Sequence, residues 1–274
     1  MLFNIFAAAA LAATSVLGSA TPTINLRDES LTLNPPISTI NEARDVPLSQ
    51  LEARSLTNAR RLAEGLPLNP PKRRTHTEVS RALPSGTPSN DVRQGIIQVF
   101  TGDILLGYVK AATNSFGEYG ITADAAQALL VSVDVTDAAT GVADIGTING
   151  PDASYPFFGG IVGFSSSNDD LASGSFNYVY LGATTQTEPN SPPVDGANSF
   201  THATSLSKKI ESAIWTFDAS TNTLTSQWIN TDSSSPATFI GYYASDNVFI
   251  LTGDKTTFTN NFGPTPWVTL KLVA

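Results

Sequence analysis

From residue 95 onward, apolar and polar side chains alternate with a period of two. Every second residue is aliphatic over 129–135 and again over 268–272. This period places the aliphatic side chains on one face of a β-strand. Further runs separated by Gly, Asn, Asp, Ser and Pro indicate strands at 95–100, 103–110, 160–164, 175–182, 213–218, 223–230, 237–243 and 247–252. The pattern predicts an all-β fold over residues 94–274, an antiparallel β-sandwich or jelly-roll-like domain of about ten short strands.

Little helix is expected in this domain, with brief helical turns only at 123–129 and 206–211. A longer helix is predicted at about 50–64, because residues 49–52 have a capping-box pattern and Gly65 and Pro67 end the apolar stripe.

The chain has 274 residues and no cysteine. Disulfides, thiol catalysis and thiolate metal sites are therefore excluded, and apolar burial and hydrogen bonds must hold the fold together. Only two histidines occur, His76 and His202, so zinc sites built on several histidines are excluded as well.

The N-terminus has the features of a secretory signal peptide over residues 1–20. An apolar run at 5–13 is followed by small residues ending at Ala20, where a signal peptidase would cut. The run is too short to span a bilayer. We therefore expect a secreted protein with no membrane attachment after signal removal.

Residues 21–93 form a leader that contains a basic cluster, Lys72, Arg73 and Arg74. An endoprotease of the secretory pathway could cut there, which would make the predicted helix part of a propeptide. Alternatively, the cluster is a solvated linker and the helix docks on the domain. No periodic pattern argues for packing between residues 21 and 47.

Charge is distributed unevenly along the chain. Residues 1–74 carry 8 Lys and Arg against 6 Asp and Glu, whereas residues 75–274 carry 7 against 18. A domain this acidic repels phosphate backbones, so nucleic acid is not an expected partner.

Phe176, Tyr178 and Tyr180 alternate along one predicted strand. Spaced by about 6.8 Å, they could form a ladder on which sugar rings stack. Core packing explains them equally well, because Val179 and Leu181 make the opposite face largely apolar too.

Two of the three tryptophans belong to one predicted hairpin. If Phe217 pairs with Leu224, Trp215 lies opposite Ser226 and diagonal to Trp228. Both indoles then share a face with Phe217 and Leu224, which predicts that they are core residues.

Trp267 differs from the other two, because it shares its strand face with Thr269 and Lys271. Exposing the apolar indole to solvent on a polar face is energetically unfavourable, and an exposed apolar side chain of this size often marks a binding site. We therefore predict that Trp267 is exposed and contacts a ligand.

Clustered oxygen ligands occur at Asn168, Asp169 and Asp170, in a turn bounded by Ser and Gly. Such a cluster could bind calcium, and no other cofactor is expected. The alternative is that these side chains solvate the loop and hydrogen-bond its backbone.

Catalytic carboxylates for glycoside hydrolysis could come from Asp103, Glu118, Glu211 or Asp254, if two of them lie close together in the fold. Serine catalysis would require His202, and no Gly-x-Ser-x-Gly stretch presents a nucleophile.

Several short stretches resemble a group of secreted proteins from mushroom-forming fungi that has no assigned activity. They are residues 56–61 with 65–67, 159–164, 212–215 and 227–232. The resemblance implies a secreted fungal protein and brings no catalytic residues with it.

Taken together, these features favour a secreted, non-catalytic protein that binds cell-wall or environmental glycans. Two alternatives remain open: a glycoside hydrolase or lyase with paired carboxylates, and a structural protein of the cell wall or matrix. Paired carboxylates in a cleft would favour the enzyme, and an exposed aromatic strip would favour the binding protein.

Processing gives a first testable expectation. Protein recovered from the culture medium should begin near Thr75, because Lys72 to Arg74 lie between the leader and the domain. Intact-mass analysis measures this directly, and a mass that retains residues 21–74 would contradict it.

Overall fold

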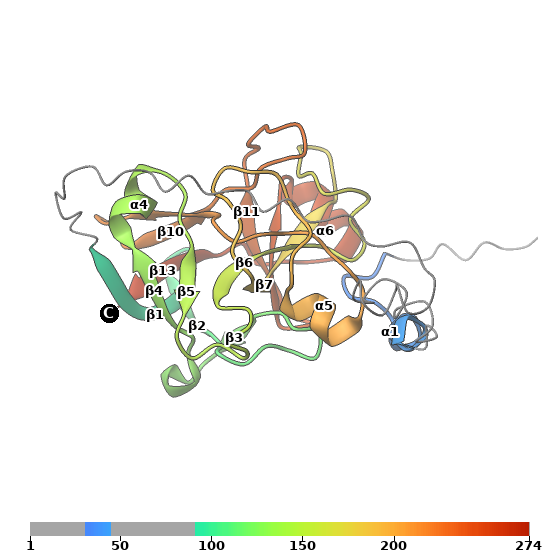
Figure 1. Ribbon diagram of the computed structural model, residues 1–274, viewed down its shortest axis with the longest axis horizontal. Coiled ribbons are helices and arrows are strands. Elements are labelled where there is room, and N and C mark those ends of the chain that lie inside the picture. Colours follow the sequence, from blue (N-terminus) through green and yellow to red (C-terminus); the bar gives the residue numbers. More distant parts are fainter. Residues whose placement is uncertain (1–30, 45–90, 274) are drawn as a thin grey trace, which may run out of the picture. The chain divides into compact units, whose positions relative to one another are not determined.

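The computed structural model describes residues 31–44 and 91–273 (Figure 1). The predicted signal peptide, the helix expected at 50–64 and the basic cluster at 72–74 lie outside the described residues. Within the leader, residues 31–36 lead into helix α1 (Ile37–Arg44). No periodic pattern predicted packing between residues 21 and 47, but Leu33, Asn34 and Ile40 are buried in the structure.

The described part of the chain is mostly β and forms one antiparallel sheet of thirteen strands, which confirms the predicted all-β class. The strands are β1 (Val92–Thr101), β2 (Ile104–Val109), β3 (Ile121–Thr122), β4 (Leu130–Asp134), β5 (Ile145–Thr147), β6 (Phe157–Val162), β7 (Tyr178–Thr184), β8 (Ile210–Glu211), β9 (Trp215–Asp218), β10 (Thr223–Ser226), β11 (Phe239–Tyr243), β12 (Val248–Thr252) and β13 (Thr269–Val273). The sequence pattern missed β3, β5 and β8, because strands of two or three residues are too short to display a period of two.

The main strand order is β11-β12-β7-β6-β5-β4-β1-β13-β10-β9. The sheet curls so that β11, at one end of this order, meets the segment that leads into β13. Gly241 of β11 forms a bridge with Trp267, and Val268 N donates to the carbonyl of Ile240 at 2.9 Å. Because a curled sheet encloses its concave face, side chains from both halves of the strand order pack against one another.

Two buried clusters lie on opposite faces of β6, β7 and β12. The inner cluster joins these strands to the other half of the sheet and includes Val131, Val179, Trp215, Phe249 and Leu270. The outer cluster is covered by helices and includes Ile161, Tyr178, Tyr180, Phe200 and Phe258. Every residue of β7 is buried. The interpretation of this strand as buried on both faces is therefore correct.

Two helices cover the outer cluster, α5 (Ser199–Thr204) and α6 (Lys255–Phe262), and both lie beside β6 and β7 in Figure 1. The structure also contains α4 (Val135–Thr140) and the 3-10 turn η1 (Ala125–Gln127). The turn agrees with the expectation for 123–129. The helical turn expected at 206–211 is wrong, because Ser205 ends α5 in the left-handed conformation and residues 210–211 form β8.

The tryptophan hairpin has the predicted register. Phe217 pairs with Leu224 and Ser226 pairs with Trp215. Trp215 and Trp228 are fully buried, and Trp215 Nε1 donates to the carbonyl of Phe158 at 2.5 Å. Both indoles therefore belong to the core, as the hairpin pattern predicted.

Stability without cross-links can be tested at two fully buried positions. Replacing Val131 or Leu270 with Ala should lower the free energy of unfolding by about 2 to 4 kcal/mol, because each change leaves a cavity in the inner cluster. Chemical denaturation measures the loss, and a reducing agent should not change it. Val92→Ala is the matched control, because Val92 is 54% exposed. Losses below about 0.5 kcal/mol at both buried positions would contradict the packing.

Candidate functional site

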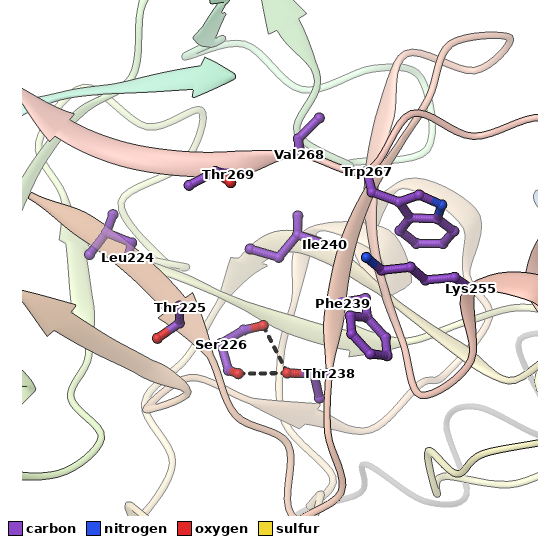
Figure 2. A pocket seen from close by; sticks show the side chains of 10 residues that line it. All are labelled: Leu224, Thr225, Ser226, Thr238, Phe239, Ile240, Lys255, Trp267, Val268 and Thr269. Carbon is purple, nitrogen blue, oxygen red and sulfur yellow. Dashed lines mark hydrogen bonds between the residues drawn. The ribbon is translucent and has the colours of Figure 1, made fainter. Parts of the chain in front are cut away.

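A surface pocket lies where β11 meets β10 and the segment leading into β13, and Trp267 forms part of its wall (Figure 2). The pocket has a volume of about 160 Å³. Its lining comes from β10, β11, the start of α6 and the segment before β13, and consists of Leu224, Thr225, Ser226, Thr238, Phe239, Ile240, Lys255, Trp267, Val268 and Thr269. Four of these residues carry hydroxyl groups, so the lining offers hydrogen-bonding groups beside apolar faces.

Two aromatic rings and one cation define the mouth of this pocket. Lys255 Nζ lies 4.5 Å from the centre of the Phe239 ring and 5.5 Å from the centre of the Trp267 ring. Figure 2 shows the Lys255 side chain extending between the two rings. Cation–π attraction holds the ammonium group there at the surface.

Trp267 is half-buried, so the prediction that it is exposed is only partly met. One side of its indole packs on Phe258 of the outer cluster and on Gly241. Leu270 and Leu272 point into the core as predicted, while Thr269 is exposed. The polar strand face was therefore assigned correctly, but the close approach of β11 covers part of the indole.

The predicted aromatic ladder is not an exposed platform. Tyr178 and Tyr180 are fully buried, and Phe176 is half-buried against Phe262 of α6. Helices α5 and α6 cover the face on which a sugar would have to stack. These rings lie in the outer cluster, and Phe176, Tyr178 and Tyr180 do not join Trp267 in one binding surface.

The turn considered for calcium is tied to the rest of the protein. Asn168 Oδ1 accepts from Asn177 Nδ2 at 2.7 Å, and the Asp170 carboxylate accepts from Thr231 N at 2.7 Å. Asp169 pairs with a lysine, Lys209, at 2.8 Å. Among the described residues no group of three or more His, Asp or Glu side chains could hold a metal ion. These contacts fit the alternative in which the side chains order the loop.

Two of the candidate catalytic carboxylates, Glu118 and Glu211, are buried. Glu118 forms an isolated β-bridge with Gly182 of β7, and Gly182 pairs with Gly159 of β6. Glu211 of β8 pairs with Gly160, the residue that follows Gly159 in β6. Directly paired residues share a face of a sheet and consecutive residues alternate between faces. Glu118 and Glu211 therefore face opposite sides of the sheet and do not form a catalytic pair.

The other two candidates are also separate. Asp103 is exposed in the turn between β1 and β2. Asp254 caps α6, because its carboxylate accepts a hydrogen bond from Thr257 N at 2.9 Å. Its other oxygen accepts from Gly174 N, in the loop before β7, at 2.8 Å.

Glu118 instead lies in a buried polar group that the sequence pattern did not reveal. Its Oε2 accepts from Asn114 Nδ2 at 2.8 Å and from Asn34 Nδ2 at 3.1 Å. Asp246 Oδ2 accepts from the same Asn34 nitrogen at 2.9 Å. Asn34, Asn114 and Asp246 are separated by up to 212 positions in the chain, so no local motif could have identified them.

Burial dominates the electrostatics of both glutamates. It raises the pKa of Glu118 to about 8, although the hydrogen bonds from Asn114 and Asn34 act in the opposite direction. Burial likewise raises the pKa of Glu211 to about 9, against a hydrogen bond from Ile229 N. Both carboxyl groups are therefore mostly protonated at neutral pH.

Gly117 allows the turn that positions Glu118. Its φ is +82°, and a Cβ at this position would lie 2.3 Å from the carbonyl oxygen of Ser199. A side chain would therefore both strain the backbone and push α5 away.

Comparison with protein-family models, with curated protein sequences and with solved structures found no match to this chain. No helix in residues 31–44 or 91–273 is long and apolar enough to cross a membrane.

The two raised pKa values predict that Glu118 and Glu211 make the protein more stable at pH 5 than in mild base. The folded state holds the proton of Glu118 up to a pKa of about 8 and that of Glu211 up to about 9, whereas both groups ionise near 4.5 in the unfolded chain. The stability that these two protonated groups contribute should be fully present below pH 4.5, should decline as the pH rises above that value, and should be lost once the pH has passed the folded-state values of about 8 and 9.

Chemical denaturation across this pH range tests the dependence. Glu118→Gln and Glu211→Gln should each reduce the dependence of the free energy of unfolding on pH, because an amide does not ionise. Glu188→Gln, at an exposed position, is the matched control. A free energy of unfolding that rises between pH 5 and 8 would contradict the assignment.

Proposed function

We propose that this is a secreted, non-catalytic protein that binds a glycan in the surface pocket beside Trp267. The observation that carries the proposal is the combination of a half-exposed indole, the Phe239 ring and four hydroxyl-bearing residues around one small pocket. Sugar rings present an apolar face to aromatic side chains and a polar rim to hydroxyl groups. The proposed ligand site thus offers both kinds of contact.

Lys255 adds charge selectivity to the proposed site. The domain is acidic overall, so an ammonium group at the pocket mouth is a local exception that favours a ligand carrying a carboxylate. A glycan containing uronic acid residues would pair with Lys255 and stack on Trp267. We therefore expect tighter binding to acidic polysaccharides than to neutral ones.

Secretion belongs to the same proposal and is supported by the N-terminal sequence. The apolar run before Ala20 has the pattern of a signal peptide. The resemblance to secreted fungal proteins agrees with an extracellular role at or near the cell wall.

A second candidate, a glycoside hydrolase with paired carboxylates, has one observation in its favour. Glu118 and Asp246 both contact the Asn34 amide nitrogen, at 3.1 and 2.9 Å, so their carboxylates lie close together. One of the two has a raised pKa, as a general acid requires. Release of reducing ends from a polysaccharide panel, lost in Glu118→Gln, would favour this candidate over the binding protein.

Trp267→Ala tests the proposed glycan site. The substitution should weaken binding to a polysaccharide by about 1 to 3 kcal/mol, because it removes the stacking surface. Retention on immobilised neutral and acidic polysaccharides measures the loss. Tyr108→Ala is the matched control, since Tyr108 is another half-buried aromatic residue and does not line the pocket.

Trp215→Ala should give the opposite result, with a loss of about 3 to 5 kcal/mol in stability, since the indole is fully buried. If Trp267→Ala retains full binding while it remains folded, the pocket is not the glycan site.

A further inference from the structure

Consecutive residues of the leader are held by the domain through specific polar contacts. The carbonyl of Thr32 accepts a hydrogen bond from Ser165 Oγ at 2.6 Å. The carbonyl oxygen of Leu33 accepts hydrogen bonds from the hydroxyls of both Tyr178 and Tyr180. Two side-chain donors that converge on one carbonyl oxygen form a recognition site for that oxygen.

The two hydroxyls are oriented by the loop that follows β6. Tyr178 Oη accepts from Ser165 N at 3.1 Å, and Tyr180 Oη accepts from Phe164 N at 3.2 Å. Because these bonds use lone pairs, each hydroxyl proton remains available for the carbonyl. Lys208 Nζ fixes the same loop by donating to two of its carbonyls, at 2.9 and 3.0 Å.

The next side chain of the leader, Asn34, is recognised by two carboxyl groups. Its amide nitrogen donates to Glu118 Oε2 and to Asp246 Oδ2, so both amide protons have acceptors. Asn114 donates to the same Glu118 oxygen and holds it in place. The domain thus binds a backbone carbonyl and the carboxamide side chain of the residue that follows it. A peptide that contains asparagine carries both groups in this order.

The leader fills this site without satisfying all of it. Glu118 Oε1 and Asn34 Oδ1 are buried and have no hydrogen-bond partner in the structure. The Leu33 side chain is 3% exposed and belongs to the outer cluster, whereas Ile37, the first residue of α1, is 74% exposed. The buried contacts of the leader are therefore concentrated on residues 32–35. Helix α1 adds one buried residue, Ile40, and a hydrogen bond from Arg44 Nη2 to the carbonyl of Ala203.

We propose that Tyr178, Tyr180, Asn114, Glu118 and Asp246 form a recognition site for an asparagine-containing peptide, which leader residues Leu33 and Asn34 occupy in the uncut chain. Cutting the leader at Lys72 to Arg74 removes the covalent link between this segment and the domain. The site then becomes available to a peptide from outside. It lies on residues other than those of the glycan pocket.

The test uses the full chain and a fluorescent peptide of residues 31–44. The wild-type chain should bind the peptide weakly, because its own leader fills the site. A full-length variant with Leu33→Ala and Asn34→Ala should bind the same peptide at least tenfold more tightly, since the competing segment is weakened. Fluorescence anisotropy measures both dissociation constants.

Two matched peptides test the recognition of asparagine. The peptide with Asn34→Ala should lose at least tenfold in affinity, whereas the peptide with Asn41→Ala should bind like the wild type, because Asn41 is exposed. On the side of the domain, Tyr178→Phe combined with Tyr180→Phe in the Leu33→Ala, Asn34→Ala background should abolish peptide binding and retain cooperative unfolding.

Cleaved wild-type protein provides a measurement that does not depend on the double variant. After digestion with an endoprotease specific for paired basic residues, labelled peptide 31–44 should exchange for the leader fragment. Exchange with the wild-type peptide but not with the Asn34→Ala peptide supports the proposal. Three outcomes overturn it: no binding to a folded double variant, equal binding of the Asn34→Ala peptide, or unfolding of the domain when the leader fragment dissociates.

Discussion

Burial of strand β7 on both faces is the constraint on which the rest of the structure depends. With no cysteine, the fold relies on apolar contacts, and β7 supplies them in two directions. Val179 and Leu181 enter the inner cluster, while Tyr178 and Tyr180 enter the outer one. Because both faces of this strand are apolar, each face must be covered by other parts of the protein. The curl of the sheet covers one face, and α5, α6 and the leader cover the other.

Covering the outer face places polar groups where water cannot reach them. The hydroxyls of Tyr178 and Tyr180 are buried, and an unpaired buried hydroxyl would cost free energy. Loop N–H groups and the Leu33 carbonyl satisfy them. Glu118 avoids a buried charge by keeping its proton, which burial favours through the raised pKa. The leader therefore contacts the domain at a buried polar region, and the pocket beside Trp267 is lined by other residues.

The positions of strands with a clear period of two, such as β4 and β13, were predictable because one face of each strand is buried and the other is more exposed to solvent. The Trp215 hairpin was predictable in register because its turn fixes which residues pair. Helix α6 was missed although Asp254 is a good N-cap and Phe258 and Phe262 have helical spacing. At the candidate sites, Trp267 stood out because of its polar neighbours in sequence. Asp246 and Asn34 did not, because only the fold brings them together.

The sequence by itself determined the all-β class, the inward faces of the longer strands and the reliance on burial without disulfides. These properties follow from the local alternation of apolar and polar residues and from the composition, and both can be obtained from the sequence without knowing which segments are neighbours in the fold. The tertiary structure alone decided that Tyr178 and Tyr180 bind a carbonyl, that Glu118 and Glu211 face opposite sides of the sheet, and that Leu33 and Asn34 dock on the domain. Each of these depends on which strand lies beside which, and strand neighbours are chosen by contacts between residues far apart in sequence.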